Sequence, residues 1–537
     1  MSFDPTTGGP SPGNVSHRTS GPLLCYRRRV NQLPLWGAEP RARSTIKPLS
    51  KSRVAAGLQC HKRLYFECYH YNSRDAVEPA RQALMESGTE VGRVARGRYP
   101  GGVTITEDRF KTAEAAASTR AAMNDPRIPA IYEATFQHDN ISVRVDVLAR
   151  NKQGAWDLIE VKSSGGVKDE HIPDLAVQFF VVEGAGVTVS RAGILHVNKQ
   201  YVWPGGPYDL DELFRFQDLT SQARRVRDEL ISDIAAMREP LWAMEPPEVP
   251  IGSHCESPYR CPFYGTCHGG PRTEHPIDAL PRLNARLRRE LEEAGIEDIR
   301  NIPEDFGGLS ELQRRVRACV LAQAHYVSPE LSDALAVARF PIHFLDFETC
   351  NPALPLVPGT RPFQQTPFQW SNHVLEADGT LRHLEYLHVE RTDPRGPLVR
   401  ALLEALGEEG TIVVYSDFEE RMIKELAEAI PDERERLLRL LDSRILDLHR
   451  VIHTHYYHPG FQGSFSIKQV LPVVVPDLSY EGLEIREGSQ AALAFIDMTD
   501  PAQPPNVRAR LREGLLHYCR RDTEAMVRLY QKLKEYT

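Results

Sequence analysis

The chain has 537 residues, of which 41% are hydrophobic and 26% are charged, and its formal net charge at pH 7 is −8. This length predicts two or three globular domains, because a single hydrophobic core stops growing well below it. The acidic balance excludes a polycation that coats nucleic acid. Any contact with a phosphate backbone therefore needs local basic grooves or bridging metal ions.

The sequence also suggests where the protein works. No apolar run approaches the roughly 20 residues of a transmembrane helix, and the N-terminus lacks the apolar region of a signal peptide. Nine cysteines in such a chain indicate metal or cluster ligands, or buried thiols, rather than disulfides. We therefore expect a cytoplasmic α/β protein with no membrane partner.

Residues 1–45 are rich in Gly, Pro, Ser and Arg, which predicts a disordered leader. A first domain is expected over residues 46–275, ending in a Pro-rich segment that contains cysteines. Its expected elements, with Asp-Asn and Gln-Gly as turn signals, are helices over about 50–70 and 78–96, strands within 130–164, a helix over 174–185, a strand over 192–198 and a helix over 219–239. Residues 276–338 are expected to form a helical connector to a second globular unit, residues 339–537.

Two strands of the first domain carry charged residues among apolar ones. "VRVDVLAR" contains Asp146, and "DLIEVKSS" contains Glu160 and Lys162, which are two residues apart and so share a face of the strand. Antiparallel pairing would set Asp146 against Glu160, and two nearby carboxylates attract a divalent cation. The lysine could stabilise an attacking hydroxide or the charge on a phosphate. A surface salt bridge on an edge strand is the alternative interpretation of the Glu-Lys pair.

This pattern, with Gln178 on the following helix, resembles the RecB-like branch of the PD-(D/E)XK nucleases. The resemblance implies a restriction-endonuclease-like fold in which Asp146 and Glu160 bind metal, Lys162 is the catalytic lysine and Gln178 is a site residue on the helix. The chain departs from the G-x-x-x-H pattern that such enzymes often carry upstream. Here "GTEV" is followed by Gly92, and Glu90 is the nearby carboxylate that could replace the missing imidazole.

Three cysteines, Cys255, Cys261 and Cys267, are each separated by five residues in a Pro-rich loop. Such a loop is poor material for a helix or a strand and good material for metal ligands. Cys60 or Cys68 could supply a fourth thiolate. The remaining cysteines are expected to be lone thiols: Cys25, Cys319, Cys350 and Cys519, together with whichever of Cys60 and Cys68 is not a ligand.

One cysteine before the nuclease core and three after it resembles the iron–sulfur nucleases of the RecB-like group. That resemblance implies a [4Fe–4S] cluster held by Cys60, Cys255, Cys261 and Cys267, which would tie the two ends of the domain together. Zinc in a four-thiolate site is the alternative, because cysteine spacing does not separate the two metals.

The second unit opens on "IHFLDFETC", where Asp346 and Glu348 face the same side of an apolar strand. Two carboxylates in that position repel each other unless a cation lies between them. Near the C-terminus, Tyr518 precedes Asp522 by four residues on an amphipathic helix, so their side chains lie one turn apart on the same face.

This set resembles the DEDD exonucleases of the RNase H-like fold whose last motif is Y-x-x-x-D. The resemblance implies that Asp346 and Glu348 form the first motif and Asp522 the last, with Tyr518 orienting the attacking water. The second motif reads Phe418-Glu419, so Glu419 is the predicted ligand and Asp417 the alternative. These carboxylates would hold two divalent ions, Mg²⁺ or Mn²⁺.

Two further segments of the second unit carry polar residues that suit substrate contacts. In "GSFSIKQVLP", Lys468 with Ser464 and Ser466 could contact a phosphate, or could be an ordinary solvated loop. The three histidines of "HTHYYHP" favour contacts within a substrate loop over a zinc site, for which the usual cysteine or glutamate partners are missing; they are His453, His455 and His458.

Most of the chain from Leu49 also resembles a bacterial family of unknown function, domain of unknown function 2779. The resemblance rests on "LSKSRVAAGLQCHKRLYF", "EVKSSGGVKDEHIPDLAVQ", "HCESPYRCPF", "FLDFETCNPALP" and "GSFSIKQVLP". It supports the domain layout and names no activity.

We therefore expect a metal-dependent nuclease that hydrolyses DNA, from single-stranded ends, in repair, recombination or defence. One alternative is a nucleic-acid-binding scaffold with a degenerate first centre in which only the DEDD centre cuts. Another is an RNA-directed 3′–5′ exonuclease. The sequence contains no G-x-x-x-x-G-K-[ST] loop, which disfavours a helicase or other motor.

Overall fold

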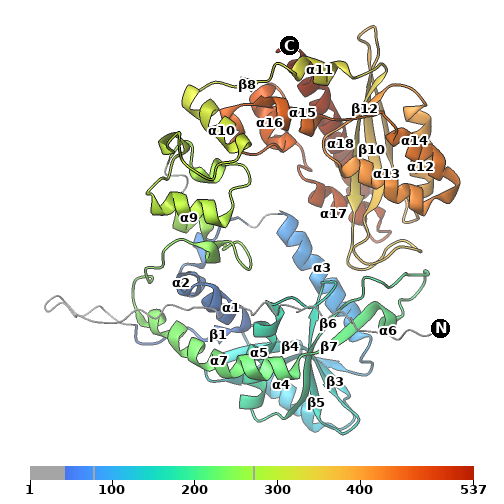
Figure 1. Cartoon of the computed structure of the whole chain (residues 1–537). Coiled ribbons are helices and arrows are strands. Elements are labelled where there is room, and N and C mark those ends of the chain that lie inside the picture. Colours follow the sequence, from blue (N-terminus) through green and yellow to red (C-terminus); the bar gives the residue numbers. More distant parts are fainter. Residues whose placement is uncertain (1–42, 77–78, 270–272) are drawn as a thin grey trace, which may run out of the picture.

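The computed structural model describes residues 43–76, 79–269 and 273–537. Two mixed α/β units follow one another, one built on a seven-stranded sheet and the other on a five-stranded sheet. Figure 1 shows the first unit in blue to green and the second in yellow to red. The α/β class expected from the sequence is thus confirmed. The predicted leader, apart from its last three residues, and Cys25 lie outside the described residues.

The first sheet has the strand order β2-β3-β4-β5-β6-β7, and β1 pairs with β4. Strands β3, β4 and β5 are antiparallel neighbours, and β5 and β6 run parallel. Asp139 and Asn140 join β3 to β4 with φ values of 46° and 54°, so the Asp-Asn turn predicted from the sequence forms a tight hairpin. The strands are β1 Leu49–Ser50, β2 Val103–Thr104, β3 Ala130–His138, β4 Ile141–Arg150, β5 Trp156–Lys162, β6 Val189–Val197 and β7 Phe214–Asp218.

Helices flank this sheet and extend from it toward the second unit. Helices α5 and α7 pack on each other, and α3 contacts both β5 and α17 of the second unit (Figure 1). The helices are α1 Lys51–Gln59, α2 His61–Tyr69, α3 Pro79–Arg96, α4 Thr112–Asn124, α5 His171–Gly184, α6 Leu210–Leu213 and α7 Thr220–Arg238, followed by α8 Tyr264–His268 in the cysteine-rich loop.

The residues expected to form a helical connector share an apolar core with the second unit. Ile277, Leu291 and Leu335 are buried in the same cluster as Phe344 and Tyr530. The elements of this stretch are α9 Ala285–Glu293, α10 Glu311–Ala322, β8 Tyr326–Val327 and α11 Leu331–Ala336.

The second sheet has the order β11-β10-β9-β12-β13. Strands β9, β10 and β11 are antiparallel, whereas β12 runs parallel to both β9 and β13. The strands are β9 Ile342–Cys350, β10 Thr366–Leu375, β11 Leu381–Leu387, β12 Thr411–Val414 and β13 Ile445–Asp447, with a short β14 Tyr456–Tyr457 that pairs with β8.

Both faces of this sheet are covered by helices, and the alternation along β9 decides which side chain goes where. Leu345 and Phe347 pack with α12, α13 and α14. Phe344 packs on the opposite face with α18. Asp346 and Glu348 share the parity of Phe344 and therefore point toward α18. The helices are α12 Arg395–Leu406, α13 Phe418–Ala429, α14 Arg434–Leu441, α15 Leu448–His455, α16 Ile467–Val474, α17 Gly488–Thr499 and α18 Pro505–Lys534.

In the described part of the chain, no helix combines the length and the apolar character needed to cross a membrane.

Candidate functional site

Four carboxylates of the second unit meet in one cavity of about 420 Å³. Asp346 and Glu348 come from β9, Glu419 from the first turn of α13, and Asp522 from α18. Strand β12 pairs with β9 only as far as Phe344, so the two acidic residues of β9 lie beyond the end of that pairing. Three sequence-distant elements thus bring their acidic side chains together around the centre of the sheet.

The electrostatics of this cavity oppose ionisation. Burial, then Asp522 and Glu348, raise the pKa of Asp346 well above its usual value. Burial and the neighbouring carboxylates do the same for Glu348. Burial raises the pKa of Glu419 to about 8 and that of Asp522 to about 6. A bound cation offsets the repulsion among these carboxylates and favours the ionised form of each one.

Within the described part of the chain, one carboxylate oxygen of the cavity is not used in a hydrogen bond and remains available to such a cation. Oε2 of Glu419 is buried and has no hydrogen-bond partner among the residues that the structure describes. Oxygen atoms of Asp346 and Glu348 lie within 4.8 Å of each other and of the Cys519 sulfur. The donor set, mostly carboxylate oxygen, suits Mg²⁺ or Mn²⁺.

Aromatic hydroxyls and an ammonium line the other side of the cavity. The Tyr480 hydroxyl donates a hydrogen bond to Oδ1 of Asp522. Lys468 donates to the Tyr518 hydroxyl at 3.2 Å, and Tyr518 in turn hydrogen-bonds to Asp522. Burial, reinforced by Asp522, raises the pKa of Tyr518 above its usual value, so this hydroxyl remains protonated.

The structure places the residues that the sequence left open. Glu419 is buried and lines the cavity, whereas Asp417 is exposed at the N-terminus of α13. A further acidic residue, Asp447 at the end of β13, caps α15 by accepting from the Arg450 amide at 3.0 Å. Lys468 lines the cavity. The nearby serines, Ser464 and Ser466, are exposed and 3.3 Å apart.

The three histidines of the following segment do not converge on one point. His453 packs on Phe465 at 4.8 Å between ring centroids. His455 hydrogen-bonds to Ser328 at 3.1 Å. The His458 ring lies 6.3 Å from the His325 ring.

Sequence reasoning did not identify two residues that contact carboxylates of this cavity, Tyr480 and Cys519. Tyr480 lies in a loop without a recognisable motif. Cys519 was expected to be a lone thiol, but its sulfur lies 3.6 Å from Oδ2 of Asp346. Its position, one residue after Tyr518 on the same helix, was the available clue.

The first centre forms around Glu160 of β5. Strands β4 and β5 pair up to Val147 and Ile159, and the next residues in that register are Asp146 and Glu160. The Val161 amide donates to Oδ2 of Asp146 at 2.8 Å. Asp146 therefore caps the neighbouring strand at the point where the ladder ends.

Every described contact of the Glu160 carboxylate is with a donor. Lys51 donates to its Oε1 at 2.6 Å, and the Lys162 ammonium lies 2.9 Å from the same oxygen. Gln178 donates to Oε2 at 2.7 Å, while its own Oε1 is buried without a partner among the described residues. Lys162 also donates to Asp174 at 2.8 Å.

Charge at this centre is balanced by the lysines. Burial alone would keep Glu160 neutral, but Lys51 and Lys162 outweigh it and lower its pKa to about 2. Asp146 lacks such a partner at close range, and burial together with Glu160 raises its pKa to about 7. Two neighbouring carboxyls with pKa values this far apart are typical of functional sites.

Sequence reasoning did not predict that Lys51 and Asp174 belong to this centre. Lys51 begins α1, more than one hundred residues before Glu160, and only the tertiary fold brings them together. Asp174 lies one helical turn before Gln178 on α5, which was the available clue.

Helix α3 carries the segment in which the RecB-like pattern would place a histidine. Glu90 is exposed and is held by Arg93 at 2.6 Å. A side chain at Gly92 would meet open space. Glu90 therefore has no described contact with Asp146 or Glu160 and does not take the place of the expected histidine in this structure.

All four cysteines singled out from the sequence line one small cavity. Cys60 precedes α2, and Cys255, Cys261 and Cys267 surround it. Burial raises the pKa of Cys60, Cys261 and Cys267. Cys68 is buried elsewhere in the apolar core. The fold thus joins the two ends of the first unit at this point.

The spacing of the thiols bears on the choice between the two candidate metals. Among the described residues, no three of these sulfurs lie within 4.8 Å of one another. Tetrahedral zinc at about 2.3 Å from each sulfur holds the sulfurs about 3.8 Å apart. As described, these thiols are therefore spaced more widely than the ligands of a tetrahedral zinc ion. Lys62 and Arg63 also line the cavity and place positive charge next to the thiols.

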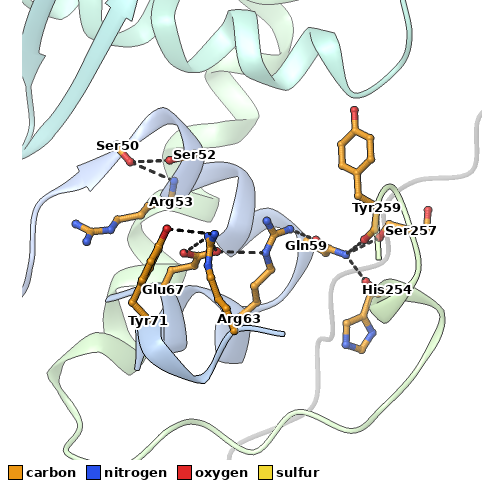
Figure 2. Close-up of polar contacts among 11 residues, drawn as sticks. Ser50, Ser52, Arg53, Gln59, Arg63, Glu67, Tyr71, His254, Ser257 and Tyr259 are labelled. Carbon is orange, nitrogen blue, oxygen red and sulfur yellow. Dashed lines mark hydrogen bonds and ion pairs between the residues drawn. The ribbon is translucent and has the colours of Figure 1, made fainter. Parts of the chain in front are cut away.

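A glutamine adjacent to the first thiol ties the two sides of this cavity together. Gln59 donates to the carbonyl oxygens of His254 and Tyr259 at 2.6 and 2.8 Å (Figure 2). Farther along α2, buried Glu67 accepts from Arg74 at 2.5 Å.

A family model described as a domain of unknown function (DUF2779) matches residues 343–466. This segment includes Asp346, Glu348 and Glu419 and ends before Asp522. No curated protein matches the chain.

Proposed function

We propose that this protein is a metal-dependent nuclease whose main hydrolytic centre is the acidic cavity of the second unit. The observation that carries the proposal is the convergence of Asp346, Glu348, Glu419 and Asp522 in one cavity, with pKa values raised by burial and mutual repulsion. Three antiparallel strands followed by two parallel ones, with acidic residues on the central strand, support an RNase H-like fold.

Each residue of the cavity has a task in this proposal. Divalent ions held by the four carboxylates would activate water and neutralise charge on the departing oxygen. The Tyr518 hydroxyl, held by Lys468, orients the attacking water toward the phosphorus. Lys468 also offers a positive charge to a phosphate oxygen, and Tyr480 fixes the rotamer of Asp522.

The size of the cavity supports a single-stranded end as substrate. A volume of about 420 Å³ is at the small end of ligand sites and favours one frayed nucleotide over a base-paired end. We propose DNA as the polymer, in repair, recombination or defence within the cytoplasm. RNA is the alternative, since we assign no residue of the cavity to bind or exclude a 2′-hydroxyl.

The proposal also includes a RecB-like PD-(D/E)XK centre in the first unit. It is supported by the close approach of Asp146, Lys162 and Gln178 to Glu160. The unpartnered amide oxygen of Gln178 is suited to accept from a metal-bound water. In this proposal Asp146 and Glu160 would hold a divalent ion, and Lys162 would contact the scissile phosphate.

One observation favours the alternative in which the first centre binds nucleic acid without cutting it. Lys51 lies 2.6 Å from the Glu160 oxygen that a metal ion would need. A cation must displace this ammonium, or share the carboxylate with it, before the centre can act. The missing upstream histidine points the same way.

The thiol cavity would hold a [4Fe–4S] cluster through Cys60, Cys255, Cys261 and Cys267. The spread of the sulfurs, wider than zinc requires, supports this choice. The cluster would clamp α1 and α2 to the loop that closes the first unit.

A cleavage assay tests the proposal. Anaerobically purified protein is incubated with end-labelled single- and double-stranded DNA and RNA in Mg²⁺ or Mn²⁺, beside the Asp522→Ala and Lys162→Ala variants. We expect Asp522→Ala to abolish cleavage, with Asp417→Asn as the matched control that retains it. Loss in Lys162→Ala as well would assign chemistry to the first centre, and no loss would favour the binding-only alternative. Cleavage that survives both substitutions, or no cleavage of any substrate, would overturn the nuclease proposal.

Optical absorption tests the metal of the thiol cavity. We expect a brown protein with a broad visible band and about four iron atoms per chain, because a cubane has four irons. A colourless protein that contains zinc would contradict the cluster.

A further inference from the structure

The loop that carries three of the four thiols also reaches the first centre. Tyr259 lies between Cys255 and Cys261, and its backbone is fixed from two directions. Gln59 donates to the carbonyl oxygens of His254, Ser257 and Tyr259 at 2.6, 3.2 and 2.8 Å (Figure 2). The Cys261 amide donates to the Cys255 carbonyl at 2.7 Å. The base of the Tyr259 side chain is therefore held in place.

The other end of this side chain is held as well. Its hydroxyl donates to Oε1 of Glu170 at 3.0 Å. Glu170 immediately precedes α5, the helix that carries Asp174 and Gln178 of the first centre. Burial and Glu170 raise the pKa of Tyr259 to about 12, and Lys162 and Asp174 are near enough to act on it. The ring therefore stands at the edge of the first centre.

A large part of the ring nevertheless faces solvent. Tyr259 is 50% exposed, although its side chain is anchored at both ends. Lys168, an exposed ammonium, lies 3.8 Å from the same Glu170 oxygen. Figure 2 shows the Tyr259 ring pointing away from the Gln59 contacts. A fixed and exposed aromatic face is well suited to stack on a base, while the Lys168 charge beside it is shared with Glu170.

We propose that Tyr259 stacks on an unpaired base of the strand bound at the first centre, which makes the thiol loop part of the nucleic-acid-binding surface. The proposal rests on the nucleic-acid binding proposed above. Because the side chain is already ordered, stacking costs little conformational entropy. The partner is a single strand, since both faces of a base are covered inside a duplex.

A binding experiment tests this role. The full chain, purified anaerobically, is titrated against a labelled single-stranded DNA of about 12 nucleotides, with Ca²⁺ in place of Mg²⁺ so that binding is measured without cleavage. We expect Tyr259→Leu to weaken binding about tenfold, the effect of losing one stacked base. Tyr259→Phe keeps the ring and loses only the Glu170 hydrogen bond, so its affinity should stay within about twofold of the wild type.

Two controls separate stacking from a structural role. Phe340→Leu removes an aromatic ring of similar exposure, 45%, just before β9 in the other unit, and should bind as the wild type does. Replacing one nucleotide at a time by an abasic residue should reveal one position where the wild type loses affinity. At that position Tyr259→Leu should lose no more.

The outcomes are distinct. Equal loss in Tyr259→Phe and Tyr259→Leu would show that only the loop contact with Glu170 matters and would overturn the proposal. So would a Tyr259→Leu variant that binds as tightly as the wild type. A wild type that binds no DNA strand would overturn the proposed function as well, which distinguishes that failure from a failure of Tyr259 alone.

Discussion

Glu419 and Asp417 lie two residues apart at the same helix N-terminus, yet only Glu419 enters the acidic cavity. Its carboxylate is buried, with one oxygen unpartnered among the described residues, while Asp417 faces solvent. Burial, rather than position in the sequence, therefore distinguishes the two carboxylates. A carboxylate in solvent binds a cation weakly because water competes, whereas a buried one near three others needs the cation.

We expect Glu419→Gln to reduce cleavage at least about 100-fold, because a lost metal ligand removes several kcal/mol of transition-state stabilisation. The same substitution should leave the metal-free protein as stable as the wild type or more so, since it removes a charge that the cavity opposes. Cleavage rates and thermal melts in EDTA measure the two effects. Asp417→Asn is the matched control, and a Glu419→Gln variant of undiminished activity would exclude this residue from the centre.

The raised pKa values of Glu419, about 8, and Asp522, about 6, give a pH dependence of known sign. Between the unfolded pKa near 4 and these folded values, the native state binds more protons than the unfolded one. The stability that these two groups contribute is therefore fully present below about pH 4 and is lost as the pH rises from there through about 6 for Asp522 and about 8 for Glu419.

Metal-free protein should accordingly unfold at a lower urea concentration at pH 8 than at pH 6, and Mg²⁺ should stabilise it more at pH 8. Urea unfolding followed by circular dichroism in EDTA and in Mg²⁺ measures this. Glu419→Gln should flatten the metal-free trend. A metal-free stability that rises from pH 6 to pH 8 would contradict the assignment.

Lys51 is the residue whose removal best probes the first centre. Its ammonium competes for the Glu160 oxygen at 2.6 Å, so Lys51→Met should raise the affinity of this centre for Mn²⁺ by about tenfold, if the lost competition is worth about 1.4 kcal/mol. Calorimetric titration in the Asp522→Ala background isolates this site. Lys168→Met, which removes an exposed lysine of the same unit, is the control, and unchanged Mn²⁺ binding in both would favour a first centre that takes no metal.

At the scale of elements, α1 connects two places that are distant in function. Lys51 at its first residue contacts Glu160 of the first centre, and Gln59 at its last residue holds the thiol loop. Ser50 caps its N-terminus through the Arg53 amide, which favours a well-defined start. A nine-residue helix is marginal alone, so its ends are held by these tertiary contacts.

Gln59→Ala should therefore loosen the cysteine loop without touching a thiol. The substitution leaves three carbonyl groups without their donor, and we expect a lower iron content per chain and faster loss of visible absorption in air. Gln153→Ala, in an exposed turn, is the control. Full retention of iron in Gln59→Ala would show that the thiols alone hold the loop.

At the scale of the whole molecule, one loop joins the two units. Residues 351–365 connect β9 to β10; Asn351 and Gln365 at its ends line the acidic cavity. Its middle packs into the other unit: Leu354 is buried in the same cluster as Phe214. The Gly359 amide also donates to the Trp203 carbonyl at 2.7 Å.

Leu354→Asp should weaken this contact, because it places a charge in an apolar cluster. We expect the two units to unfold in separate calorimetric transitions in the variant, where the wild type shows one. Cleavage at the acidic cavity should also fall, since the loop begins three residues after Glu348. Leu381→Asp on exposed β11 is the control, and identical thermograms for all three proteins would show that the units are not coupled through this loop.

Many of the candidate site residues could be predicted from local sequence patterns. The i, i+2 pairs on β5 and β9 and the i, i+4 pair on α18 mark side chains whose relative direction follows from strand or helix periodicity. The evenly spaced cysteines were identified by residue type and spacing in a Pro-rich loop. The Asp-Asn hairpin and the α/β class followed from equally local signals. These predictions concern groups within a few residues of one another.

Contacts between residues far apart in the sequence could not be predicted from such patterns. Lys51 with Glu160, Tyr259 with Glu170 and Cys519 with Asp346 join residues from different elements, and no spacing rule links them. The packing of residues 277–335 into the second core was equally hidden, since a helical pattern gives the direction of an apolar face but not its partner.

The sequence by itself determined which residues carry charge, sulfur or an aromatic ring, and which neighbours share a face, because backbone periodicity is a local property. Only the tertiary structure decided which carboxylates are buried together, which lysine reaches Glu160 and which aromatic ring stands at its edge. Burial depends on everything packed around a group, and burial is what turns an ordinary acidic residue into one that requires a cation.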